Sequence, residues 1–147
     1  MPFDPNNTVI ALCAAGMAVE GTPDEARALF EQAWAARQDD YDAAIAAHYL
    51  ARHQPTPEST LEWNGRAVAH AEAVADDRAG DLLASLYLNW GDSLRTKGDV
   101  AAARDAAERA ARHLNALPDD GYRALIAQGI ARLQARVSDD RDQAPVI

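Results

Sequence analysis

Two rows of polar side chains recur at helical spacing, and they are the groups of this chain best suited to chemistry. The rows contain Tyr41, His48 and Arg52 on one segment and Ser85, Asn89 and Asp92 on another. The planar guanidinium of Arg52 can hold a carboxylate or another anion through two parallel hydrogen bonds. The imidazole of His48 can donate a hydrogen bond or carry a proton, and the Asn89 amide can orient a bound group. We therefore predict a polar binding site in which Arg52 recognises an anion.

The same rows also have a structural interpretation. Arg52 and Asp92 would then form an ion pair that ties two parts of the chain together, with His48 satisfied locally. Replacing either residue alone would then destabilise the protein, and a double-mutant cycle would show the coupling between the two. Both interpretations stay open at the level of sequence.

The three tryptophans lie on separate predicted helices, a distribution that favours packing over an aromatic cage. Trp90 shares a helical face with Leu83, Leu86 and Leu94, so we expect it in the core. Trp63 is the first residue of a separate face of its own helix and is therefore added to the candidate binding residues.

The histidines do not form a metal site by their spacing. His48 and His53 are five positions apart and diverge by more than a right angle on a helix. His70 and His113 have no ligand-type partners nearby in the sequence. No nucleophile motif or phosphate-binding loop is recognised. We expect no metal, no cofactor and no catalytic residue.

Charge and composition limit the partners and the fold class. The 147 residues carry a formal net charge of −9, which disfavours nucleic acid and anionic membrane surfaces. Hydrophobic residues make up 48% of the chain, many of them alanine, which favours closely packed helices over strands. The apolar stretch 9–19 is too short to span a membrane, and no basic region precedes it. Together with the single cysteine, Cys13, this predicts a cytoplasmic protein with an inert core thiol.

Two similar helix starts recur at a fixed offset. Thr22-Pro23-Asp24-Glu25 and Thr56-Pro57-Glu58-Ser59 lie 34 residues apart. We expect Thr22 to form a capping box with Glu25, and Gly21 to end the preceding helix in a left-handed turn. Capping and breaking residues predict seven helices and a disordered tail: about 6–20, 23–37, 40–53, 57–75, 82–97, 99–116, 121–137, and the tail 138–147.

These elements resemble the tetratricopeptide family. The resemblance is carried by Trp90-Gly91, Leu94, Gly98-Asp99, Ala103, Ala110 and Pro118. The segments AAHYLARHQPTPESTLEWN (46–64) and SLYLNWGDS (85–93) are similar to small actinobacterial tetratricopeptide proteins. The resemblance implies an all-α, right-handed superhelix of antiparallel helical hairpins over residues 1–137. It also implies a concave groove lined by the first helix of each hairpin.

The expected function follows from that groove. We expect a non-catalytic adaptor that binds a segment of a protein partner, with the two polar rows and Trp63 in contact with it. The alternative is a small-molecule binder or cofactor-free enzyme, with a polar pocket for a small anion between helices 40–53 and 82–97. Self-association into a homodimer through the first or last helix is a third possibility for the exposed ends.

Overall fold

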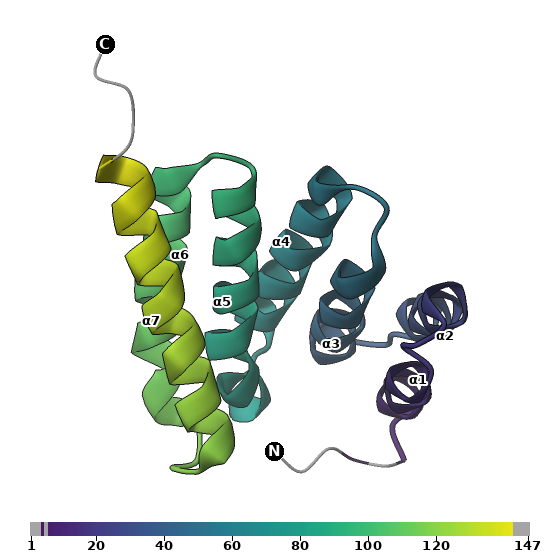
Figure 1. Ribbon diagram of the computed structural model, residues 1–147. Coiled ribbons are helices and arrows are strands. Elements are labelled where there is room, and N and C mark those ends of the chain that lie inside the picture. Colours follow the sequence, from purple (N-terminus) through teal and green to yellow (C-terminus); the bar gives the residue numbers. More distant parts are fainter. Residues whose placement is uncertain (1–3, 5, 143–147) are drawn as a thin grey trace. The chain divides into compact units, whose positions relative to one another are not determined.

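The fold is all-α, as the sequence predicts. A computed structural model describes residue 4 and residues 6–142, and within them it contains seven α-helices and no strand (Figure 1). The helices are α1 (Thr8–Ala18), α2 (Pro23–Ala35), α3 (Asp40–Leu50), α4 (Pro57–Ala73), α5 (Gly80–Thr96), α6 (Val100–His113) and α7 (Gly121–Asp142). Three short 3-10 helices accompany them: η1 (Ala51–His53), η2 (Asp77–Ala79) and η3 (Leu114–Ala116).

The chain forms two compact units, Met1–Ala79 and Gly80–Ile147. The first contains α1 to α4 and the second contains α5 to α7. The boundary falls between η2 and α5. The single repeat domain that the sequence predicts over residues 1–137 stays a prediction.

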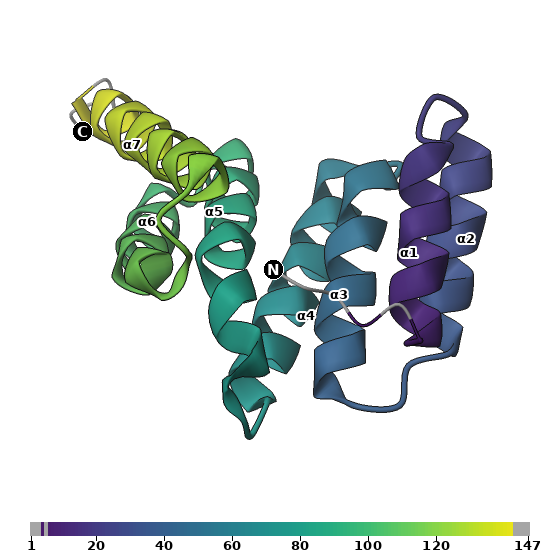
Figure 2. The same cartoon turned by 90° about the horizontal axis from the view of Figure 1, so that it is seen from below.

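The first unit is built from two helical hairpins. The helices α1 and α2 pack together, α3 packs on α4, and α3 also contacts both α1 and α2 (Figure 2). The largest fully buried side chain is Phe30 of α2, which lies against Gly16 of α1. A methyl group added at Gly16 would meet the Phe30 ring at 2.3 Å. The small residue therefore allows the two helices to approach closely.

The second unit is a hairpin of α5 and α6 with α7 packed on both helices. Its core contains the predicted face of α5, since Leu83, Leu86 and Leu94 are buried. Trp90 is only half-buried, so its predicted place in the fully packed core is wrong. Its ring centroid lies 6.1 Å from that of the buried Tyr87, at the edge of the core.

The single cysteine has the predicted environment. Cys13 is a free cysteine that is buried on α1. Burial raises the pKa of its thiol to about 12, because the apolar surroundings disfavour the thiolate. The thiol is therefore protonated at neutral pH.

The capping box predicted at Thr22 is not formed. Thr22 occupies the N-cap of α2 but makes no side-chain cap hydrogen bond, whereas Thr56 forms a capping box with Ser59. The backbone also differs: ψ is 86° at Thr22 and 152° at Thr56, and the second value lies in the extended region typical of a cap. The amide of Thr22 is also tied to the Val19 carbonyl at 2.8 Å.

The left-handed turn predicted at Gly21 occurs instead at Gly98. The φ angle of Gly98 is 93°, and no other described residue has a positive φ. The Gly98 amide donates to the Arg95 carbonyl, and the Asp99 amide donates to the Leu94 carbonyl, both at 2.9 Å. These two bonds form the Schellman motif that ends α5. Asp99 then caps α6 by accepting from the Ala102 amide.

The last helix is longer than predicted. It continues past Val137 to Asp142, so the expected disordered tail does not begin at Ser138. One reason is an ion pair in which Arg95 Nε lies 2.9 Å from Asp140 Oδ2, which holds this end of α7 against α5. Residues 143–147 of the expected tail lie outside the described residues.

Candidate functional site

Two of the predicted binding residues lie at the end of α3 in the first unit. His48 is in the last turn of α3 and Arg52 is in the 3-10 turn η1 that continues it. Arg52 Nη2 lies 3.0 Å from Glu20 Oε2, and His53 Nε2 lies 2.8 Å from the same oxygen. The carboxylate that Arg52 holds is therefore one from the same unit. Glu20 was not among the partners considered from sequence, because it follows α1, far from Arg52 in the chain.

The electrostatics of His48 differ from those of a proton carrier at neutral pH. The ring is half-buried, and it meets the neighbouring Tyr49 ring at a centroid distance of 4.9 Å. The pKa of His48 is lowered to about 4, mainly by burial and also by the positive charge of Arg52, while Glu20 opposes the shift. His48 is therefore neutral near pH 7, where one ring nitrogen donates a hydrogen bond and the other accepts one.

Tyr41 lies at the opposite end of α3, in its first turn. The side chain is 7% exposed, and the guanidinium carbon of Arg78 lies 4.6 Å from the centre of its ring. Arg78 in turn lies close to the carboxylates of Asp76 and Asp39. These contacts give Tyr41 a structural role at the beginning of α3.

Trp63 packs against Trp34, which belongs to the other hairpin of the first unit. Their rings meet edge to face with centroids 4.9 Å apart and an interplanar angle of 86°. The guanidinium of Arg37 lies over the Trp34 ring at 3.9 Å, and that of Arg66 lies over the Trp63 ring at 4.5 Å. This contact supports packing between hairpins, the interpretation that the sequence favoured for the tryptophans as a group.

The second predicted row lies on α5 in the second unit. The Ser85 hydroxyl donates to the Leu82 carbonyl at 3.2 Å, so it is satisfied within its own helix. Asn89 and Asp92 are half-buried. Burial raises the pKa of the Asp92 carboxyl above its ordinary value, which is the opposite of the shift that a close ion pair would cause.

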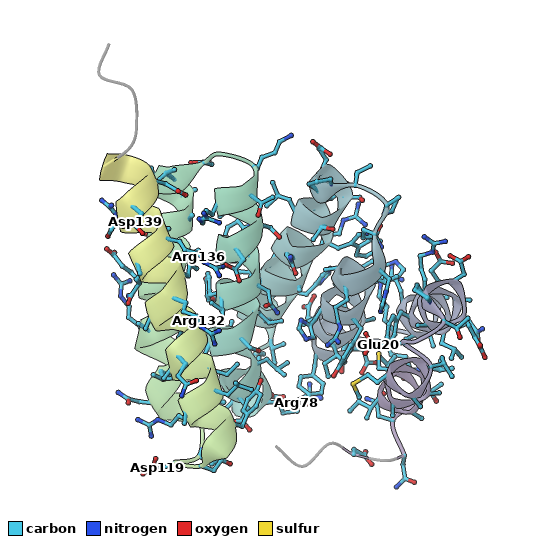
Figure 3. All side chains as sticks on the ribbon, viewed as in Figure 1. Glu20, Arg78, Asp119, Arg132, Arg136 and Asp139 are labelled. Carbon is cyan, nitrogen blue, oxygen red and sulfur yellow. The ribbon has the colours of Figure 1, made fainter. Side chains whose placement is uncertain are left out.

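The positive charges that oppose this shift at Asp92 come from α5 and α7. In decreasing order they are Arg136, Arg95 and Arg132. Arg132 and Arg136 are exposed residues one turn apart on α7, and their side chains extend from α7 toward α5 (Figure 3). Asp92 is therefore grouped with arginines of its own unit.

Two large exposed apolar side chains, Tyr122 and Leu125, lie on the same flank of α7 as these arginines. We call the surface formed by Asp92, Tyr122, Leu125, Arg132 and Arg136 the α5–α7 face. Sequence reasoning missed its α7 residues because it considered the last helix only for self-association. A signal was present: Arg132 and Arg136 flank the buried stripe of Ile126, Ile130, Leu133 and Val137.

A polar cavity of about 640 Å³ lies in the first unit at the beginning of α1 and α3. Its lining includes Asn7, Thr8, Arg37, Gln38 and Asp42. The buried Asp42 carboxylate accepts hydrogen bonds from the Asn7 side chain at 2.8 Å and from the Gln38 amide at 3.0 Å. These bonds connect the segments before α1 and α3, so the polar lining has a structural role.

The described residues contain no group of three or more His, Cys, Asp or Glu side chains that could hold a metal ion. Among the same residues, no helix is both long and apolar enough to cross a membrane. Comparison of the chain with family models, curated proteins and solved structures gives no match in any of the three.

Proposed function

We propose that this protein is a tetratricopeptide-like adaptor, in which helical hairpins of a right-handed superhelix bind a segment of a protein partner without catalysis. One observation carries the proposal: both units repeat the same relationship between helices. In the first unit, α1 contacts the first helix of the next hairpin, α3, and in the second unit α5 contacts α7 in the same way. Such stacking of first helices produces a continuous surface in helical repeats.

The side chains on these first helices support binding as the activity. Arg52 and Glu20 occupy the α3 end, and Asp92, Arg132 and Arg136 occupy the α5–α7 face. Arginine and exposed aromatic or aliphatic side chains are enriched where proteins meet. The half-exposed Arg52 side chain already holds a carboxylate, which is the geometry that recognition of an acidic partner would use.

The alternative is a small-molecule binder or cofactor-free enzyme. It would place a small anion on Arg52 in exchange for Glu20, with His48 as a hydrogen-bonding neighbour. A neutral His48 supports hydrogen bonding better than proton transfer at neutral pH. This favours a binding role over an acid–base role for the cluster.

Selection from a phage-displayed library of random peptides tests the proposal. Selected peptides should bind the purified protein, and amide chemical shifts should change on α1 and α3 or on α5 and α7. Scrambled versions of the same peptides serve as controls. Shifts confined to α2, α4 and α6, or no selection above the scrambled controls, would contradict the proposal.

The alternative is tested in parallel with small carboxylates and phosphates. Thermal melts of the wild type and of Arg52→Gln, each with and without these compounds, should show stabilisation that depends on Arg52 if a small anion is the ligand. Saturable stabilisation of the wild type alone, without any peptide binding, would replace the adaptor proposal with this one.

A further inference from the structure

We propose that the α5–α7 face binds an extended acidic peptide, with an aliphatic side chain on Leu125 and Tyr122 and two carboxylates on Arg132 and Arg136. This inference rests on the adaptor function and specifies the chemistry of its partner. It concerns one face of the second unit, whose residues share a flank of α7.

The apolar end of the face is open to a partner. Tyr122 is 48% exposed and Leu125 is 58% exposed, although both are large apolar side chains. They are three positions apart and therefore adjacent on the helix surface. Exposed apolar pairs bordered by charge are typical of binding sites.

The polar end of the face presents two arginines to a partner. Arg95 is engaged with Asp140, whereas Arg132 and Arg136 are exposed and one turn apart, near the half-buried Asp92. Asp139 is also exposed and follows Arg136 by three residues, so the charges at this end are balanced. The attraction for carboxylates therefore comes from the two exposed guanidinium groups themselves.

The spacing along α7 defines the peptide. Leu125 and Arg132 are seven residues apart, about 10 Å along a helix that rises ~1.5 Å per residue. An extended peptide covers about 3.3 Å per residue, so roughly three peptide residues span that distance. Arg136 lies one turn further, which about two more peptide residues reach. The expected pattern is an aliphatic residue followed by acidic residues at the third and fifth positions after it.

Side-chain carboxylates of a peptide fit this face better than a nucleic acid. Two adjacent arginines can each take a carboxylate in a bidentate arrangement. A nucleic acid would extend well beyond the two arginines and be repelled by the acidic remainder of the chain. A second copy of this chain is the other occupant that the test must separate.

The probe is a short fluorescein-labelled peptide, Leu-x-x-Glu-x-Glu with Gly and Ser at the other positions, measured by fluorescence anisotropy. We expect saturable binding to the full chain. The double substitution Arg132→Gln/Arg136→Gln should weaken binding about tenfold or more, as should Gln in place of both peptide Glu residues. Leu125→Ser should weaken it as well. The matched control, Arg104→Gln/Arg112→Gln on α6, removes the same charge elsewhere and should leave binding unchanged.

Each other outcome contradicts the inference. Equal losses in the two double variants would mean attraction by overall charge, and no binding of the probe would mean that the face does not take this peptide. Light scattering that shows dimers broken by Leu125→Ser would assign the face to a second copy of the chain. If random peptides still bind on α1 and α3 while the acidic probe fails, the adaptor function stands and only this inference is lost.

Discussion

Trp34 of α2 and Trp63 of α4 meet edge to face at a centroid distance of 4.9 Å, and each ring has a guanidinium over it. The two helices belong to different hairpins of the first unit. Their contact therefore connects one hairpin to the next through aromatic and cation–π interactions.

A double-mutant cycle on these tryptophans should show this coupling. We expect Trp34→Leu and Trp63→Leu each to destabilise the protein, and the double variant to be more stable than additivity predicts by about 0.5–1.5 kcal/mol. Urea denaturation measures the four free energies of unfolding. Additive losses would mean that the rings do not interact in solution.

A methyl group at Gly16 should destabilise the first unit because it would meet the Phe30 ring. We expect Gly16→Ala to cost about 1–3 kcal/mol, despite the better helix propensity of alanine. Gly21→Ala is the matched control, since Gly21 has no atom within 4 Å of the added methyl and does not have a left-handed backbone. Its melting temperature should stay the same or rise. A stabilising Gly16→Ala would disprove the close approach of α1 and α2.

The two threonine starts should respond differently to alanine. Thr56→Ala removes an N-cap acceptor that binds the Ser59 amide at 3.1 Å, so it should cost about 0.5–2 kcal/mol. Thr22→Ala should be close to neutral, because Thr22 makes no cap hydrogen bond through its side chain. Chemical denaturation of both variants under one set of conditions measures the difference. A larger loss at Thr22 would restore the capping box that the sequence predicts there.

These two threonines also show where sequence reasoning works and where it stops. The helix starts at Pro23 and Pro57 follow from local chemistry and were predicted correctly. Whether the threonine side chain caps is not fixed by residue type, since Thr56 forms the cap hydrogen bond and Thr22 does not. The same holds for Gly21 and Gly98, since both can adopt a left-handed turn and only the second does.

The candidate site was predictable only in part for a similar reason. Helical spacing placed His48 and Arg52 together near the end of one helix. It could not supply Glu20, which reaches Arg52 through the packing of α1 against α3. Likewise two of the three arginines around Asp92, Arg132 and Arg136, come from α7, whose contact with α5 is tertiary and leaves no local signal at Asp92.

The free energy of unfolding should decrease as the pH is lowered through a window set by the pKa of His48. Its pKa is about 4 in the folded protein and about 6.5 in the unfolded chain, so between these values only the unfolded chain gains a proton at this position. The stability that depends on a neutral His48 is fully present above about pH 6.5 and is lost as the pH falls toward 4. Urea denaturation of wild type and His48→Gln at about pH 7 and about pH 5 measures it, and the variant should lose less stability. Proton NMR of the His48 ring showing a midpoint near 6.5 would refute the shift.

Substitutions at Asn7 should separate its two hydrogen-bonding roles. Its side-chain oxygen accepts from the Val9 amide, and its side-chain nitrogen donates to Asp42 at 2.8 Å. Asn7→Asp keeps the cap but sets two carboxylates against each other, whereas Asn7→Ala loses both interactions. We expect each to cost about 1–3 kcal/mol, with no change for the neighbouring exposed Asn6→Ala. Thermal melts that show Asn7→Asp as stable as wild type would place the Asn7 side chain away from Asp42.

The hydrogen bond from Asn7 to Asp42 and the ion pair between Glu20 and Arg52 lie at the two ends of α1, and each connects it to the region of α3. A helix held at one end can fray from the other, but a helix held at both ends opens only when its partner is also released. The amides of α1 and α3 should therefore exchange with deuterium at a common rate. The first hairpin would then act as a permanent part of its unit, and the shortest segment able to fold would include both hairpins.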